Sequence, residues 1–311
     1  MQYIKELREG DQVRSIYLCR QKQLARTKNG KAYYSLTLQD RTGSIDAKIW
    51  DLSGGIANFE ELDYVEIGGE VTVYQGHPQL NVRRLRVVDM GELDVGEFLP
   101  CSQYDTEAMY GELLKFVASI KHDQLRELAE SFFVKDEAFV KEFKKHSAAK
   151  AVHHGYVGGL LEHTLSVLKL CEFFSRRYTF LDRDLLITAA MLHDIGKLRE
   201  LSAFPANLYT DEGQLLGHIV IGDHMVADRI AEIPDFPQTK ALELRHCILA
   251  HHGEFEFGSP KRPALAEAAA LHFADNIDAK METFREQTAE AVPGVWLGYN
   301  KLLDSNIRKT T

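Results

Sequence analysis

The spacing of apolar residues changes once along this 311-residue chain, and that change constrains the fold more than any other feature. Up to about residue 90, apolar and polar residues alternate, or β-branched and aromatic residues cluster, which is typical of strands. From about residue 105, apolar residues recur with the spacing of helices. The expected strands cover residues 12–19, 31–39, 44–50, 63–74 and 80–88.

Five strands in so short a segment fit a small closed barrel, with hairpin turns at Asn29-Gly30 and Asp40–Gly43. The sequence therefore predicts two domains of different class. A β-barrel is expected over residues 1–90, a linker over 91–104, and an α-helical domain over 105–311, with its core at 150–285.

The composition favours a folded protein, since 45% of the residues are hydrophobic and 27% are charged. The chain has no apolar run of about 18 residues and does not begin like a signal peptide, so we expect a cytoplasmic protein that has no membrane partner. The four cysteines lack CxxC spacing, which argues against a zinc knuckle or a disulfide framework and favours buried, reduced thiols.

The net charge of −9 hides an asymmetry between the two predicted domains. Residues 1–90 hold 13 basic and 12 acidic residues, whereas the remainder holds 24 and 34. The segment from 14 to 48 has eight basic residues and two acidic ones, an excess that could attract a polyanion. Aromatic residues interleave with these charges, as a surface for single-stranded nucleic acid needs. The expected contacts are Lys31, Lys48, Arg83 and Tyr33 or Tyr34, of which only one can point outward.

In the helical part, helices are expected over residues 182–197 and 218–231, among others. In the first of these two, the apolar run 185–192 ends in His193-Asp194-Ile195-Gly196, followed by Lys197. A buried helix that ends in an imidazole and a carboxylate offers two metal ligands from a rigid element. Lys197, one turn later, has two interpretations. It contacts a phosphate group, or it is a solvated charge at a helix terminus, where cations are favoured in any case.

Other residues with ligand chemistry lie on or at the ends of separate predicted helices. Asp275 lies among alanine and leucine residues, where a carboxylate needs a partner. Each of these residues alone could be a satisfied core or surface residue, but together they are typical of a helix bundle that assembles two metal ions. Mixed imidazole and carboxylate donors suit Mn, Fe, Co, Ni or Zn better than Ca. The candidates are His163, His218, His251, His252 and Asp275.

Residues 150–285 resemble the HD-domain phosphohydrolase superfamily. The resemblance implies that His163, His193, Asp194 and Asp275 bind one metal ion. It further implies that Asp194 bridges to a second ion held by His218 and His251, for which His252 is a weaker match. Manganese is the metal that this resemblance favours.

The basic, aromatic barrel, the segment His153–Thr164 and the HD-like part together resemble the YhaM-type 3′-5′ exoribonucleases over nearly the whole chain. This resemblance implies an OB-fold barrel that binds single-stranded RNA, with single-stranded DNA as a further substrate, and release of nucleoside 5′-monophosphates. Asp194 and Lys197 are then the expected catalytic residues. His153 and His154 either line the substrate pocket or have a helix-cap or solvent role. Asp278, one turn after Asp275, is expected to orient a ligand histidine.

Two alternatives stay open at this point. The first is another HD hydrolase that acts on nucleotides or cyclic dinucleotides. The loop after His251-His252 lacks the Gly-Tyr-Pro signature of the cyclic-dinucleotide subfamily, and a barrel is an odd accessory for a small substrate. The second is a non-catalytic RNA-binding regulatory protein, against which the presence of every proposed ligand argues. The oligomeric state is open, and a homo-oligomer is one of the options.

Overall fold

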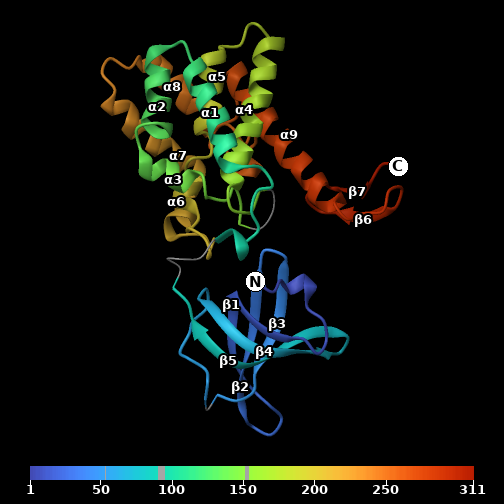
Figure 1. Ribbon diagram of the computed structural model, residues 1–311. Helices are drawn as coiled ribbons and strands as arrows, with labels where there is room; N and C mark the ends of the chain where they lie inside the picture. Colours follow the sequence, from blue (N-terminus) through green and yellow to red (C-terminus); the bar gives the residue numbers. More distant parts are fainter. Residues whose placement is uncertain (53, 90–94, 151–153) are drawn as a thin grey trace. The chain divides into compact units, whose positions relative to one another are not determined.

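The computed structural model describes residues 1–52, 54–89, 95–150 and 154–311. These residues form two compact units, Met1–Cys101 and Ser102–Thr311, and we describe each by itself (Figure 1). Among the described residues, no helix has the length and apolar character that crossing a membrane requires.

The first unit is a closed five-stranded barrel, as predicted, in the order β1-β2-β3-β5-β4. β3 and β5 pair in parallel, and the other neighbours pair antiparallel. Short 3₁₀ helices, η1 (Ile4–Glu6) and η3 (Val95–Glu97), flank the strands. The strands are β1 (Gln12–Arg26), β2 (Ala32–Asp40), β3 (Gly43–Ile49), β4 (Tyr64–Tyr74) and β5 (His77–Val87).

β1 is longer than the sequence pattern indicates, because an irregular register between Cys19 and Gln21 lets it pair with β4 and then with β2. A second irregularity falls at Gly69 on β4, where an added Cβ would lie 2.4 Å from the Asn81 carbonyl oxygen. Only glycine allows the two strands to approach so closely there. The barrel interior is filled by alternate apolar residues such as Leu36 and Leu38.

The second unit is a helical bundle, as predicted (Figure 1). A further 3₁₀ turn, η4 (Phe255–Phe257), follows α8. The helices are α1 (Thr106–Ser119), α2 (Asp123–Phe133), α3 (Glu137–Phe143), α4 (Gly159–Arg177), α5 (Arg183–Leu192), α6 (Lys197–Glu200), α7 (Asp211–Glu232), α8 (Gln238–Leu249) and α9 (Ala266–Thr288).

α5 is the central helix, because it packs against α2, α4, α8 and α9. Each residue from Leu185 to Leu192 is buried, which explains why this run is apolar on all sides. The Asp182 side chain caps its first turn by accepting a hydrogen bond from the Leu185 backbone N–H at 3.1 Å. The residues that directly follow α5 therefore lie at the buried centre of the helical unit.

Four details of the sequence interpretation are wrong. The helix expected over 182–197 ends at Leu192, and α6 follows after a turn. The helix expected from His218 starts at Asp211, with a kink at Gly217, whose φ is 74°. The expected all-helical part ends in a hairpin of β6 (Trp296–Asn300) and β7 (Ser305–Arg308), since aromatic and apolar residues there flank a turn. Cys101 is exposed, whereas the other three cysteines are buried.

Candidate metal centre

Five elements of the helical unit bring their polar side chains to one place. His163 lies in the second turn of α4, and His193 and Asp194 directly follow α5. His218 follows the kink in α7, His251 and His252 follow α8, and Asp275 and Asp278 lie in α9. Three groups of these side chains have ligand atoms within 4.8 Å of one another, and a fourth group adds His154 to His163 and Asp278. The sequence-predicted metal ligands are thus brought together in space.

Asp194 occupies the middle of this arrangement and is only 2% exposed. Its Oδ2 lies 3.3 Å from His163 Nε2 and 3.4 Å from His193 Nε2. Its Oδ1 lies 3.4 Å from His218 Nε2 and 3.6 Å from His251 Nε2. Each oxygen of one carboxylate therefore faces a different pair of imidazoles.

The first cluster consists of His163, His193 and Asp275 around Asp194 Oδ2. His163 Nε2 lies 3.2 Å from His193 Nε2 and 3.3 Å from Asp275 Oδ1. Burial alone would lower the pKa of His163, but the carboxylates of Asp194 and Asp275 outweigh it and raise that pKa well above its usual value. The cluster holds strong negative charge that a cation can neutralise.

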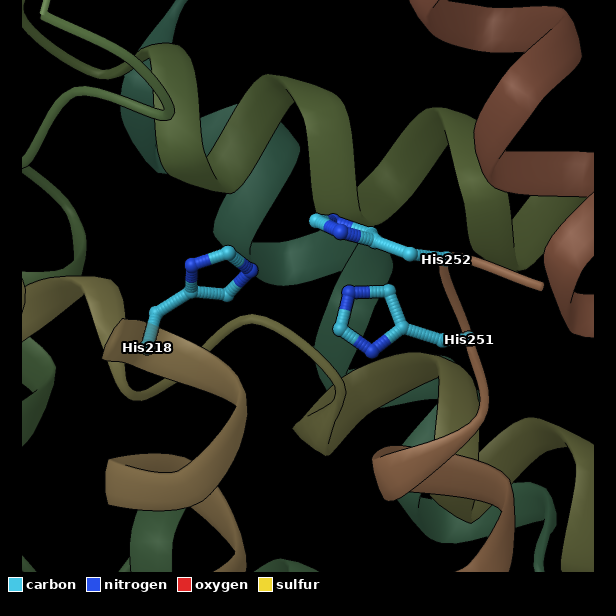
Figure 2. A group of neighbouring side chains, drawn as sticks. All are labelled: His218, His251 and His252. Carbon is cyan, nitrogen blue, oxygen red and sulfur yellow. The ribbon is translucent and has the colours of Figure 1, made fainter. Parts of the chain in front are cut away.

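The second cluster consists of His218, His251 and His252, whose rings surround a common space (Figure 2). Ring centroids lie 4.4 Å apart between His251 and His252 and 5.1 Å apart between His218 and His252. His251 Nδ1 lies 2.7 Å from the Ile248 carbonyl oxygen, so Nδ1 donates its proton and Nε2 keeps a free lone pair. Burial and the neighbouring His252 hold the pKa of His251 well below its usual value, which keeps the ring neutral.

Three buried atoms at this place have no hydrogen-bond partner among the residues that the structure describes: Asp194 Oδ1, His218 Nε2 and His251 Nε2. Buried polar atoms in folded proteins are nearly always paired, so three unpaired ones that face each other need an explanation. All three can donate lone pairs to a divalent cation, and imidazole nitrogen with carboxylate oxygen is a normal donor set for a transition metal. The residues present therefore fit a metal ion.

Lys197 lies against Asp194, with its Nζ 2.6 Å from Asp194 Oδ2. Its side chain is 14% exposed, so the interpretation of Lys197 as a solvated helix-end charge is wrong. Burial would lower the pKa of Lys197, but the charge of Asp194 outweighs this and raises it. Although burial opposes ionisation of Asp194, Lys197 and His193 hold the pKa of that carboxyl well below its usual value.

Asp278 supports the first cluster from behind. Its Oδ2 accepts hydrogen bonds from His163 Nδ1 at 2.7 Å and from His154 Nε2 at 3.0 Å. The structure thus has Asp278 in contact with a histidine of the cluster, as the sequence interpretation expects. His154 is 3% exposed and bonds Tyr156 through its other nitrogen, so it neither lines an open pocket nor caps α4, whose N-cap is Gly158. His153 lies outside the described residues.

Sequence reasoning missed Glu200, which holds the second cluster in a similar way. Its Oε1 lies 2.9 Å from His218 Nδ1 and 2.9 Å from the His218 backbone nitrogen. A Cβ at Gly196 would lie 2.0 Å from the His218 carbonyl oxygen, so glycine is needed for the turn after Asp194 to approach α7. The glycine at position 196 indicates the close approach to α7, but no pattern in the sequence predicts the contact between Glu200 and His218.

The predicted barrel contacts lie on the outside of the strands. Tyr33 stacks on Trp50 with ring centroids 4.5 Å apart, whereas Tyr34 turns inward against Phe59. Lys48 Nζ lies 2.6 Å from Ser35 Oγ. The Trp50 indole N–H donates to Asn81 Oδ1 at 3.0 Å. We call Tyr33, Ser35, Lys48, Trp50 and Asn81 the barrel face.

The other basic residues of the barrel are less available to bind phosphate groups than the number of basic residues in the sequence indicates. Lys31 is exposed, but Arg83 forms an ion pair with Glu70 at 2.8 Å. Arg14 and Arg86 both pair with Glu66. Acidic residues of β4 thus offset the positive charge of Arg14 on β1 and of Arg83 and Arg86 on β5, because folding brings distant strands together.

Comparisons with known proteins agree with both units. A family model described as an HD domain matches residues 160–280, and one described as an OB-fold nucleic acid binding domain matches residues 18–88. The fold and the site define an HD-domain hydrolase that carries an OB-fold barrel. The 3′-5′ exoribonuclease YhaM of Bacillus subtilis (strain 168) is 36% identical over 293 residues, which cover 92% of this chain and 90% of that protein. The chain belongs to the YhaM family of 3′-5′ exoribonucleases.

Solved structures resemble the chain only weakly. The second OB-fold domain of replication protein A from Methanococcus maripaludis is 21% identical, covers 30% of this chain and 98% of that domain, and has a TM-score of 0.24. The OB domain of Ta0387 from Thermoplasma acidophilum is 17% identical, covers 30% and 88%, and has a TM-score of 0.23. Likenesses at this TM-score say nothing about activity.

Proposed function

We propose that this chain is a metal-dependent 3′-5′ exoribonuclease that degrades single-stranded RNA, and single-stranded DNA as a further substrate, to nucleoside 5′-monophosphates. The observation that carries the proposal is the position of Asp194, whose two oxygens face two separate clusters. The YhaM relative supports the polymer substrate and the direction of cleavage.

In this proposal, His163, His193 and Asp275 would hold one divalent ion and His218 and His251 would hold another, and Asp194 turns one oxygen toward each set. His252, whose ring packs on both His218 and His251, completes the second set. Two adjacent ions can activate water and stabilise charge on phosphoryl and leaving oxygens. Manganese is the ion we favour, and Fe, Co, Ni and Zn suit the same donors.

Neighbouring residues of the chain set the charge of Asp194 and the orientation of the ligand histidines. Lys197 keeps Asp194 ionised through their ion pair and brings a positive charge to the place where a phosphate group would bind. Asp278 and Glu200 each accept a hydrogen bond from the Nδ1–H of a cluster histidine, which orients the ring so that its Nε2 faces the place where the metal would bind. Asp194 and Lys197 are therefore our candidates for the catalytic pair.

The barrel supplies substrate affinity in this proposal. Tyr33 and Trp50 offer aromatic surface on which bases stack, and Lys31, Lys48 and Arg83 supply positive charge for phosphates. The division into a nucleic-acid-binding domain over 1–90, a linker over 91–104 and an HD domain over 105–311 is part of the same proposal. A cytoplasmic location stays a prediction, and a homo-oligomer stays one option for the oligomeric state.

The test is to incubate the full chain and manganese with single-stranded RNA, single-stranded DNA and cyclic dinucleotides, and to compare wild type with Asp194→Ala. RNA labelled at its 3′ end should release labelled mononucleotide at once, whereas RNA labelled at its 5′ end should shorten progressively. Asp194→Ala should do neither. Cleavage of cyclic dinucleotides but not of RNA would favour the other HD hydrolases, and cleavage of nothing would refute the proposal.

A further inference from the structure

Two exposed phenylalanines lie a few residues after His251 and His252 of the second cluster. Phe255 and Phe257 lie in the 3₁₀ turn η4, and their side chains are 61% and 58% exposed. We call residues 254–262 the aromatic loop. Single exposed apolar residues are common on protein surfaces, so only the position and the surroundings of these rings can give them a meaning.

The aromatic loop is held against the metal centre. The Phe257 carbonyl oxygen lies 2.8 Å from His252 Nδ1, and the Ser259 hydroxyl donates to the Leu249 carbonyl oxygen at 3.1 Å. Gly253 has a φ of +79°, and an added Cβ would lie 2.4 Å from the His272 ring, so the turn closes on α9 only with glycine. One hydrogen bond therefore separates the Phe257 backbone from a histidine of the second cluster.

The two rings have different surroundings. The Arg262 guanidinium lies over the Phe255 ring, 5.2 Å from its centroid, and pairs with Glu254 at 2.7 Å. For Phe257, the described part of the chain provides neither a stacked ring nor a cation. Phe257 thus offers an aromatic face that no described ring or cation covers, in a loop bonded to His252 of the second cluster. In the same loop, Lys261 and Arg262 balance the charges of Glu254 and Glu256.

We propose that Phe257 is the stacking site for the base of the nucleotide whose phosphate group binds at the metal centre. The inference rests on the proposed function and adds the part of the substrate that the metal ligands do not recognise. Every base has a π-face, so an aromatic ring binds all four nucleotides without reading their sequence. An enzyme that removes residues successively from an RNA end needs this tolerance.

The experiment measures binding of two small probes, adenosine 5′-monophosphate and ribose 5-phosphate, to the full-length, manganese-loaded protein by calorimetry. Both probes carry the phosphate, but only the first carries a base. Wild type should bind the first probe about tenfold more tightly, the effect of one stacked base. Phe257→Ala should bind both probes equally well, and Phe257→Trp should restore the preference.

Phe180→Ala is the matched control. Phe180 is 74% exposed and follows the C-terminal end of α4, whereas His163 lies near the other end of that helix, about 20 Å away at the rise of an α-helix. This variant should bind both probes like wild type. The proposal fails if wild type binds the two probes equally, or if Phe257→Ala keeps the tenfold preference.

A degradation assay separates this proposal from the proposed function. If wild type degrades single-stranded RNA, Phe257→Ala should raise KM about tenfold and change kcat little. On RNA whose 3′-terminal residue lacks its base, the same variant should behave like wild type. Failure of wild type to degrade RNA would overturn the proposed function, whereas the probe-binding result would still decide the role of Phe257.

Discussion

The barrel face and the metal centre are both groups of polar side chains whose residue types indicate a role in binding, but their side chains are arranged differently. On the barrel face the side chains are partnered with each other, as Lys48 is with Ser35 and Trp50 with Asn81. In the metal centre, buried atoms of Asp194, His218 and His251 have no hydrogen-bond partner within the described part of the chain. The difference indicates that the metal centre is incomplete without a ligand. The barrel face, in our proposal, binds RNA through several weak and separable contacts.

The largest effect should come from Asp194→Asn, which keeps the shape of the side chain and removes its charge. Because one carboxylate serves both clusters, we expect a loss of at least about a thousandfold in kcat, on RNA and on a small chromogenic phosphodiester alike. A kcat of Asp194→Asn within tenfold of the wild-type value would contradict the claim that both clusters depend on this carboxylate.

Asp223→Asn is the control for this variant. Asp223 is also buried, but it is bound to Arg245 at 2.6 Å and 2.7 Å and belongs to neither cluster. It should lower the unfolding temperature while sparing catalysis by the folded protein. Equal loss of activity in both variants would indicate a folding defect rather than a lost ligand.

The next largest effect should come from the carboxylates that hold the cluster histidines. Glu200→Gln and Asp278→Asn should each lower manganese affinity about 10- to 100-fold, because an amide orients an imidazole less well than a carboxylate. Calorimetric titration with manganese measures this directly. Unchanged affinity in both variants would mean that these residues only pack the core.

A smaller effect should come from the aromatic pair on the barrel face. Replacing Tyr33 and Trp50 together by alanine should raise KM for a long single-stranded RNA about tenfold, because stacked bases lose their support. The rate on a small chromogenic phosphodiester should not change. A parallel loss on both substrates would refute the division of labour between the two units.

The smallest effect should come from single charges. Lys48→Ala should weaken RNA binding a fewfold and reduce the salt dependence of log K by about 0.7, the contribution of one phosphate contact on a single strand. Arg83→Ala should do less, since Arg83 is already paired with Glu70. Fluorescence anisotropy at several salt concentrations measures both variants, and a larger slope change for Arg83→Ala would reverse this ranking.

Local patterns were enough to predict the class of each unit. Strand alternation and turn residues indicate the five-stranded barrel, and the apolar run before His193 indicates a buried helix. The end of that helix was misplaced, because an apolar residue recurs at Ile195 although the chain already turns over residues 193–196, where Gly196 approaches α7. The hairpin after α9 was missed because its two short strands follow a long helical pattern.

Residue types also indicated which histidines and aspartates gather, but not how they are held. The contact between Glu200 and His218 joins two elements through a loop whose path has no periodic signal. The pairing of Arg83 with Glu70 depends on strand register, which a count of charges along the chain does not contain. Contacts that depend on register or loop path therefore needed the structure.

The central claim is that Asp194 joins two metal sites, and the most direct test counts ions and detects their coupling. The purified chain should be saturated with manganese, freed of excess metal and analysed by elemental analysis and low-temperature electron paramagnetic resonance. We predict two ions per chain with a spin-coupled spectrum in wild type, and one uncoupled ion in His251→Ala. A single ion in wild type, or two ions without coupling, would contradict it.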